Sequence, residues 1–414
     1  MTAVHRSFIG RVTEPLHRVF PSLHHKVWEL QRKRAIKESL DRLRTEMADL
    51  RTLAPQSERA THLVVVVHYG PDAPTWKVAG QNHFFEIYQS ACEILGANRV
   101  TLFETHANDP DFEWHARLLR AIATTQATHV IGQIEQDPNK GNQWSWDVVV
   151  SALAQSWNGV FLGVMWDSAF PWLRTRARRL GKLMPTLLIV ELCEPITGMV
   201  RAGRVEVGPC TMPMSQASVQ AILERTQDVT KSHDVTFIGA LYDYRVELIG
   251  QLRALGIDVA VNPHRPDQTR DYAESRANQP SYLDYMAGIA GSELTINFSL
   301  ASGGPHEQYK IRVQEAALVG TICLTDDQDR TRHFFDHGQF AYFEDIHDLP
   351  TVIARVLADR DQLRINQIAA QRRALELATT DFWGRIEIGL EQRGLRSLMP
   401  VHAPAEPNGT TPRF

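Results

Sequence analysis

The chain has 414 residues, of which 43% are hydrophobic and 22% charged, and its formal net charge is −4. This composition is typical of a globular protein with room for two cores, and the charge gives no reason to expect a nucleic-acid partner. Apolar runs such as "HLVVVVHY" are too short to span a bilayer, and the N-terminus lacks the apolar core of a signal peptide. The four cysteines form no C-x-x-C pair, which favours reduced thiols in a cytoplasm over a disulfide or zinc framework.

Residues 1–60 are predicted to form a basic helical extension, because they hold twelve Lys and Arg against seven Asp and Glu. Apolar residues recur there at spacings of four and three, which marks one face of a helix: Ile36, Leu40, Leu43, Met47 and Leu50. With "QRKRAIK" beside it, the segment could lie on the inner face of an anionic membrane or pair with another helix. We favour packing on the protein's own first domain, since the stripe is short for a coiled coil.

Residues 61–225 show a regular alternation of strand and helix patterns. Buried strands are indicated by "HLVVVVHYG", "RVTLFET", "THVIGQIE", "VFLGVMWDS" and "LLIVEL". Amphipathic helices are indicated between them by "NHFFEIYQSACEILG", "DFEWHARLLRAIATTQ" and "WSWDVVVSALAQSWNG". Such alternation is typical of a parallel sheet covered on both faces, so we expect a first Rossmann-like domain here.

A second series of strands and helices occupies residues 226–375, from "HDVTFIGA" onwards. Residues 376–395, with "DFWGRIEIGLEQ", are predicted as a helix that crosses back to the first domain, and residues 396–414 as a disordered tail. The fold class expected is therefore α/β, with two Rossmann-like domains whose parallel sheets face each other across a cleft. In such sheets ligands lie beyond the carboxyl ends of strands, against helix N-termini.

One stretch carries the chemistry, "PHEQYKIRVQEAALVGTICLTDD" at 305–327. Gly303 and Gly304, in the loop just before it, let the backbone approach a ligand, and the helix that follows offers free N–H groups to an anion. Lys310 and Arg312 add positive charge, which suits a diphosphate. Carboxylates accept hydrogen bonds from vicinal hydroxyls, so Glu307 and Glu315 could each hold a sugar ring. Together these features describe a nucleotide-sugar site.

The same residues carry a family resemblance. Glu307 and Glu315 form an E-x7-E motif, and the sequence around them resembles retaining GT-B glycosyltransferases. It is most similar to CgeB-type proteins, named for spore maturation, over about residues 234–375. The shared segments are "FIGALYDYR", "INFS", "RVQEAALVG", "LTDD" and "FFDHG".

The resemblance implies a hexosyltransferase of the EC 2.4 type that is metal-independent, retains the anomeric configuration and uses no cofactor beyond its nucleotide-sugar. It implies that Glu315 holds the ribose and that Glu307 touches the transferred sugar. It places Gly239 and Arg245 at the diphosphate, with Arg312 from the shared helix. It also brings Asp326, in the "LTDD" strand end, into the donor site. The acceptor would be a hydroxyl of a glycan, lipid or protein, bound by the first domain.

Alternatives remain. Asp167, His68 and His106 follow strands of the first domain and could orient or deprotonate an acceptor, and Asp167 is the one we favour. Isolated polar residues at strand ends are more often caps or turn formers. Asp327 and Asp329 could instead hold a divalent metal, as in GT-A enzymes. The chain could also be a non-catalytic scaffold or membrane-docked binding protein that keeps the GT-B fold.

Overall fold

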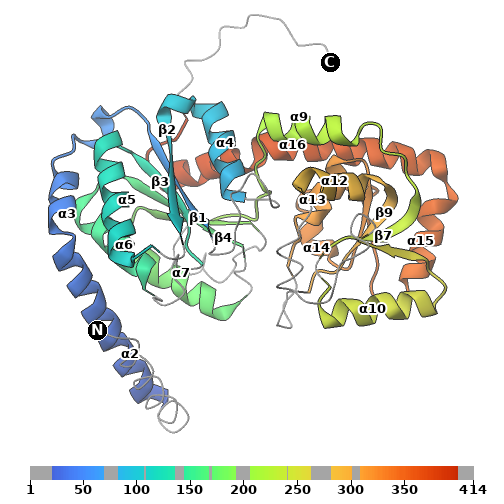
Figure 1. Ribbon diagram of the computed structural model, residues 1–414, viewed down its shortest axis with the longest axis horizontal. Coiled ribbons are helices and arrows are strands. Elements are labelled where there is room, and N and C mark those ends of the chain that lie inside the picture. Colours follow the sequence, from blue (N-terminus) through green and yellow to red (C-terminus); the bar gives the residue numbers. More distant parts are fainter. Residues whose placement is uncertain are drawn as a thin grey trace, which may run out of the picture.

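A computed structural model describes residues 21–69, 83–106, 109–135, 144–166, 170–192, 206–239, 241–262, 281–300 and 308–399. These residues form two α/β domains that lie side by side, each built on a parallel sheet (Figure 1). The predicted pair of Rossmann-like domains is therefore confirmed. None of the helices in these ranges is long and apolar enough to cross a membrane.

The first domain contains a six-stranded sheet among the described residues, in the order β2-β1-β3-β4-β5-β6, with every pairing parallel. The strands are β1 Leu63–Tyr69, β2 Val100–His106, β3 His129–Gln133, β4 Val160–Met165, β5 Leu187–Glu191 and β6 Glu206–Val207. The four consecutive valines of β1 suit its position inside the sheet, between β2 and β3. Val64 and Val66 pack into one core while Val65 and Val67 pack into the other, so both faces of the strand are buried.

Helices cover both faces of this sheet. Those of the domain are α2 Pro21–Arg42, α3 Arg44–Arg51, α4 His83–Leu95, α5 Asp111–Thr125, α6 Ser145–Ser156 and α7 Pro171–Leu183. Side chains from α3, α5, α6 and α7 share one core cluster with the sheet. The other face is covered by α4 and by the end of a long helix that arrives from the second domain.

The N-terminal extension packs on the first domain, as favoured from the sequence. Leu43, Met47 and Leu50 are buried in its core, and Ile36 and Leu40 pack against it. The apolar stripe is thus used within the chain. Residues 1–20 lie outside the described part.

A buried carboxylate fixes the extension further. Asp147 of α6 accepts hydrogen bonds from Arg32 of α2 at 2.9 Å and from Arg179 of α7 at 2.8 Å. Both guanidiniums also lie over the ring of Trp28, within 6.0 and 5.3 Å of its centroid. Removing Asp147 would leave two neighbouring cations without this partner, so it holds α2 against α6 and α7.

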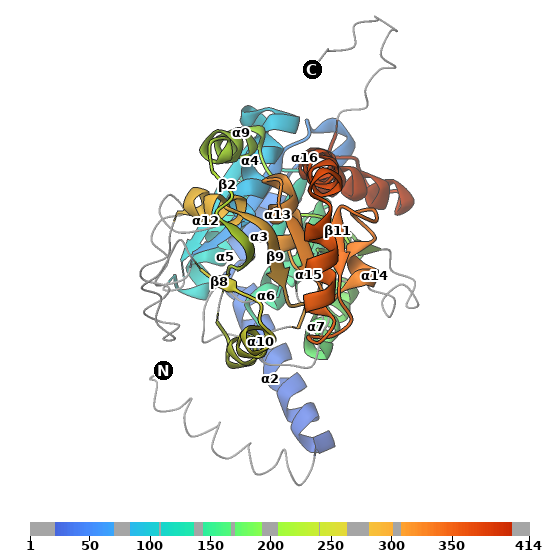
Figure 2. The ribbon, with the colours of Figure 1, turned by 90° about the vertical axis from the view of Figure 1, so that its right-hand side faces the viewer.

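The second domain contains a five-stranded sheet in the described residues, in the order β11-β10-β9-β7-β8, again parallel. Its strands are β7 His233–Phe237, β8 Val259–Val261, β9 Ser292–Asn297, β10 Ile322–Thr325 and β11 Phe340–Tyr342. Its helices are α9 Gln216–Thr226, α10 Asp243–Ala254, α12 Tyr282–Ala290, α13 Arg312–Leu318, α14 Gln328–Thr331, α15 Leu349–Ala358 and α16 Arg360–Gln392. Figure 2 looks at this domain end-on, with α9 and α16 at the top and α10 at the bottom.

The helix α16 joins the two domains. Ala370 and Ala374, in its first half, are buried in the core of the second domain, whereas Phe382 and Ile386 are buried in that of the first. Trp383, next to Phe382 on α16, donates a hydrogen bond from Nε1 to Ser90 Oγ of α4 at 3.0 Å. In Figure 1 the helix, drawn in orange and red, runs along the upper side of the second domain and continues into the first.

The predicted tail needs a correction at its start. Residues 396–399 pack on the first domain: Leu398 is only 2% exposed, and its backbone N–H donates to Glu387 of α16 at 2.8 Å. Leu398 belongs to the core cluster that contains Phe382 and Ile386 of α16. The Pro- and Gly-rich sequence that follows it led to the prediction of disorder. Residues 400–414 lie outside the described part.

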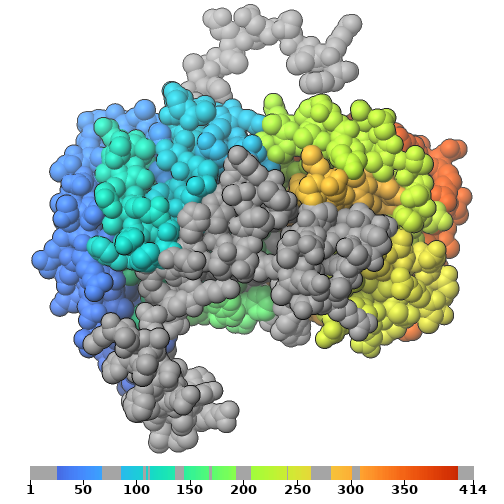
Figure 3. All heavy atoms as spheres, viewed as in Figure 1, coloured from blue at the N-terminus to red at the C-terminus, as the bar shows by residue number. Residues whose placement is uncertain are grey.

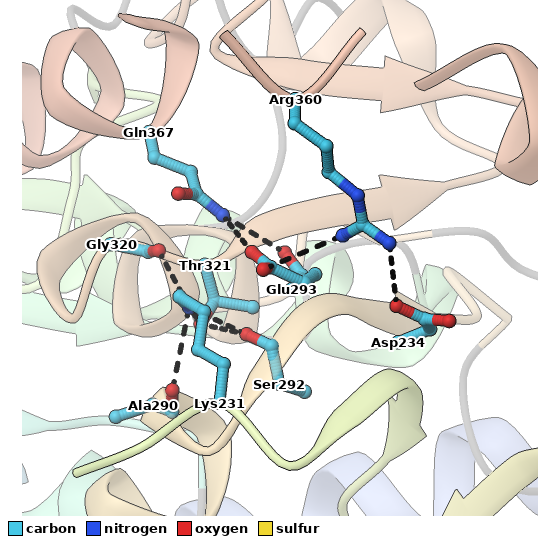
Figure 4. A network of polar contacts seen from close by, with 9 residues as sticks. All are labelled: Lys231, Asp234, Ala290, Ser292, Glu293, Gly320, Thr321, Arg360 and Gln367. Atoms are coloured by element: carbon cyan, nitrogen blue, oxygen red, sulfur yellow. Dashed lines mark hydrogen bonds and ion pairs between the residues drawn. The ribbon is translucent and has the colours of Figure 1, made fainter. Parts of the chain in front are cut away.

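The amino end of the second sheet is closed by a polar network (Figure 4). Lys231 donates from Nζ to the carbonyls of Ser292 at 2.7 Å, Gly320 at 3.1 Å and Ala290 at 3.4 Å. These carbonyls lie where α12 and α13 end and β9 begins. Burial lowers the pKa of Lys231 to about 8. One lysine thus joins the C-terminal ends of α12 and α13 to the start of β9.

Candidate functional site

Glu315 lies inside the second domain, on α13, and is only 4% exposed. Its Oε1 accepts a hydrogen bond from the hydroxyl of Tyr282 at 3.1 Å, and its Oε2 accepts one from Tyr285 at 2.7 Å. Burial, and then the charge of Glu315, raises the pKa of both phenols, which therefore remain hydrogen-bond donors. The carboxylate is thus held in a fixed orientation by two neutral donors.

Arg312 stands one turn earlier on the same helix and reaches the carboxyl end of β7. Its guanidinium lies 5.4 Å from the ring centroid of Phe237, the last residue of that strand. Burial lowers the pKa of Arg312, but Tyr285 and Glu315 outweigh this effect, so the net direction is upward. Arg312 therefore stays charged.

Gly239 provides the space that this guanidinium occupies. A Cβ built at Gly239 would collide with Nη2 of Arg312, and the backbone there has a φ of +152° that favours glycine. Asn262, just beyond β8, fixes the turn by accepting from the Gly239 N–H at 2.8 Å and donating to its carbonyl at 3.0 Å. The sequence thus needs glycine here for both shape and conformation.

Arg245, on α10, approaches the same place from another direction and is 6% exposed. Its guanidinium lies 5.8 Å from the centroid of Phe237 and 4.8 Å from that of Tyr242, and its Nε donates to the Tyr244 hydroxyl at 2.8 Å. Burial lowers the pKa of Arg245, and the charge of Arg312 lowers it further. Two cations that disfavour each other therefore both lie near the ring of Phe237, with Arg312 also against Gly239, and an anion bound there would relieve that repulsion.

The other predicted donor residues have structural hydrogen bonds. Asp326 accepts from the backbone N–H of Ser299 at 2.7 Å and so holds the chain that follows β9. Lys310 donates to Gln308 at 2.6 Å. Asp327, considered as a metal ligand, caps α14 by accepting from the Arg330 N–H at 3.1 Å.

Several predictions fall outside the described residues: Gly303, Gly304, Glu307 and Asp167. His68 and His106 were expected to follow strands but lie within them: His68 is the last residue but one of β1, and His106 is the last residue of β2. Their side chains are not described. In the part of the chain that the structure describes, no group of three His, Cys, Asp or Glu side chains could hold a metal ion.

The site lies near the junction between the domains. Glu86 of α4 accepts hydrogen bonds from the Ser215 N–H at 3.0 Å and the Ser218 hydroxyl at 2.6 Å, at the start of α9. Gln314, next to Glu315, bonds both the N–H and the carbonyl of Met212, at 3.3 and 3.0 Å. Figure 3 shows the surface of α4 meeting that of α9 at this junction.

A separate cavity of about 480 Å³ opens among α14, α15, α16 and β11. It is lined by residues such as Arg332, His337, Phe340 and Arg355. None of the predicted donor residues contributes to it. It is thus distinct from the cluster around Gly239.

Comparison with known proteins agrees with this arrangement. Residues 234–387 match a family model described as glycosyl transferase-like, and this segment contains Gly239, Arg245, Arg312 and Glu315. No curated protein matches the chain.

Solved structures show the fold. Sucrose-phosphate synthase from Thermosynechococcus elongatus is similar over 81% of this chain and 99% of its own, with 14% identity and a TM-score of 0.50. HepE of Anabaena, solved in complex with UDP and glucose, is similar over 81% of this chain and 100% of its own, with 12% identity and a TM-score of 0.52. The two-domain chain therefore has the GT-B fold, and the family match over its second domain supports sugar transfer in general.

Proposed function

We propose that this protein is a glycosyltransferase that moves a sugar from a nucleotide diphosphate sugar to a hydroxyl acceptor. The observation that carries the proposal is that Arg245 and Arg312 both lie near the ring of Phe237, at the carboxyl end of β7, with Arg312 against Gly239. In parallel α/β sheets this is where ligands bind. Two guanidiniums suit a diphosphate, which needs charge neutralisation, and the missing side chain of Gly239 makes room for one of them.

Glu315 completes the donor site in this proposal by accepting hydrogen bonds from the ribose. Glu307 would contact the transferred sugar, and Asp167 would face the acceptor. A structural neighbour, HepE, has been solved with UDP-glucose, which supports a nucleotide-sugar as the donor class. The finer likeness to CgeB-type proteins and a cytoplasmic location belong to the same proposal.

The chemical step follows from the E-x7-E resemblance. The bond between the anomeric carbon and the diphosphate oxygen breaks, the acceptor oxygen bonds to that carbon, and the acceptor proton passes to the departing phosphate. The configuration is retained and no metal is required. Arg245 and Arg312 stabilise the negative charge that develops on the leaving diphosphate.

Donor hydrolysis tests the proposal directly. The full chain is incubated with UDP- and GDP-sugars, with and without EDTA, and free nucleotide is measured. We expect turnover that survives chelation. Loss of turnover on chelation would favour metal-dependent chemistry, and absence of both turnover and nucleotide binding with every donor would contradict the proposal.

A second candidate, a membrane-docked scaffold, is favoured by the exposed side of α2. Lys26, Lys33 and Lys37 are exposed there at helical spacing, and Leu30 among them is 67% exposed. Sedimentation of the full chain with phosphatidylserine vesicles tests this surface. Binding that is lost at high salt, in a protein without donor turnover, would support the scaffold.

A further inference from the structure

We propose that Tyr282 and Tyr285 are positioning residues that orient the Glu315 carboxylate to receive the two ribose hydroxyls of the donor nucleotide. This inference rests on the proposed function and names how the same site selects ribonucleotides. Neither tyrosine was predicted from the sequence. They lie on α12, about thirty residues before Glu315, and reach it only because α12 packs on α13.

The geometry gives each tyrosine a separate task. Tyr282 bonds Oε1 at 3.1 Å and Tyr285 bonds Oε2 at 2.7 Å, so both ends of the carboxylate are held. The two rings are stacked, with centroids 5.8 Å apart and planes at 19°, as their spacing of one helical turn allows. Stacking limits the rotation of both rings. The two hydroxyls thus form a fixed pair of donors.

The helix that carries Glu315 is anchored as well. Gln314, the preceding residue, is buried and bonds the backbone of Met212 twice. Arg312 lies against Gly239 at the other end of the same turn. Backbone and carboxylate are therefore both fixed before any ligand arrives, which reduces the ordering cost of binding.

A carboxylate can accept more hydrogen bonds than the two that the phenols donate. An ionised carboxylate has about four acceptor positions, so holding it with two hydroxyls is compatible with its also accepting from a vicinal diol. A diol requires the carboxylate plane at one particular angle. Since the phenols set that angle, their removal should weaken the ribose contact. Tyr285 is also hydrogen-bonded to Arg312, so Tyr282 is the phenol whose removal should leave the diphosphate contact intact.

A purely structural role makes a different prediction. Suppose that Tyr282, Tyr285 and Glu315 served only to complete one another's hydrogen bonds in the core. Removing a tyrosine hydroxyl would then lower thermal stability without changing selectivity for ribose. The deciding measurement is the ratio of affinities for a nucleoside diphosphate and its 2′,3′-dideoxy analogue. Calorimetry on the full chain with UDP and dideoxy-UDP, and with the guanosine pair, gives this ratio.

We expect wild type to prefer the ribonucleotide by roughly tenfold or more, the range for a hydrogen bond to a charged group. Tyr282→Phe and Tyr285→Phe should each reduce this preference several-fold, and Glu315→Gln should nearly abolish it. Affinity for the dideoxy analogue should stay the same in Tyr282→Phe, which also shows that this variant folds. Tyr285 and Glu315 also act on Arg312, so for their variants the ratio of the two affinities is compared and not the dideoxy affinity alone. Tyr342→Phe, on β11 of the same domain, is the matched control and should keep the full preference.

The outcomes separate the two proposals. A wild-type preference that persists in both tyrosine variants overturns the positioning role and leaves the sugar-transfer proposal intact. A wild type that binds nucleotide without any preference for ribose overturns the ribose contact of Glu315 and this inference with it. A wild type that binds neither UDP nor GDP contradicts the proposed function itself.

Discussion

The two ends of the second sheet both hold positive charge, but the fold uses it in opposite ways. At the amino end, Lys231 donates to three carbonyls, and Arg360 is paired with Asp234 at 3.0 Å and with Glu293 at 3.5 Å (Figure 4). Each cation there joins pieces of backbone or neutralises a carboxylate. The network accounts for these residues without any ligand.

At the carboxyl end, Arg245 and Arg312 converge on the ring of Phe237 next to a glycine. The charge of Arg312 is among the causes that lower the pKa of Arg245. Bringing two cations together opposes folding, so the arrangement is better explained by binding than by stability. The comparison teaches that charge alone does not mark a site, whereas convergence of like charges at a strand's carboxyl end does.

The largest expected effect comes from removing one cation at each end. Arg312→Ala should lower the rate of donor turnover by about 10²–10³-fold, because it removes a preorganised donor to the leaving diphosphate. Arg360→Ala removes the ion pairs of this exposed arginine with Asp234 and Glu293, so turnover should be unchanged and the free energy of unfolding should fall by about 1 kcal/mol. Steady-state kinetics and chemical denaturation of both variants check this. Equal loss of turnover in the two would erase the proposed difference between the ends.

The next effect concerns glycines at the two ends. Gly239→Ala forces the backbone out of its φ of +152° and displaces Arg312, so nucleoside diphosphate affinity should fall roughly tenfold, in keeping with a strain of about 1–3 kcal/mol. Gly320→Ala is the matched control, since Gly320 has a φ of +68° and open space around its Cβ position. It should lower stability by about 1–2 kcal/mol and leave affinity unchanged. Isothermal titration with UDP and GDP separates the two; an unaltered affinity in Gly239→Ala would remove this glycine from the site.

The sequence predicts the strands and helices of the fold better than the contacts between side chains at the site. Runs of β-branched residues such as Val64–Val67 identify buried strands locally, because both faces of a parallel strand are apolar. Glu315 was predicted because it sits between Val313 and Ala316, where an inward-facing carboxylate needs a reason.

The sequence could not predict the side-chain contacts that form only when separate helices pack on one another. The stacked Tyr282 and Tyr285 reach Glu315 only through packing of α12 on α13, and nothing in their local sequence names a partner thirty residues away. The approach of both Arg245 and Arg312 to Phe237 likewise arises because α10 and α13 both begin near the carboxyl end of β7. A signal was present in "YLDY", whose tyrosines share one helix face, but that pattern is more often core packing.

The smallest effect is a dependence of stability on pH at the amino end. The pKa of Lys231 is lowered by burial from 10.5 to about 8 in the folded protein. The unfolded chain therefore binds its proton more tightly, and the charged lysine opposes folding in full below pH 8. That opposition decreases as pH rises from 8 towards 10.5, so folding should gain about 1 kcal/mol between pH 8 and pH 9 from this group.

Urea denaturation at both pH values measures this gain, with Lys231→Met as the variant that lacks the titrating group. The difference between wild type and variant should shift in favour of wild type as the pH rises, while nucleotide affinity stays the same in both proteins. A difference that does not change with pH would mean that Lys231 is better solvated than its contacts to Ser292 and Gly320 indicate. Lys231 would then be as well solvated as a surface lysine. The difference between the two ends of the sheet would depend on Arg245 and Arg312 alone.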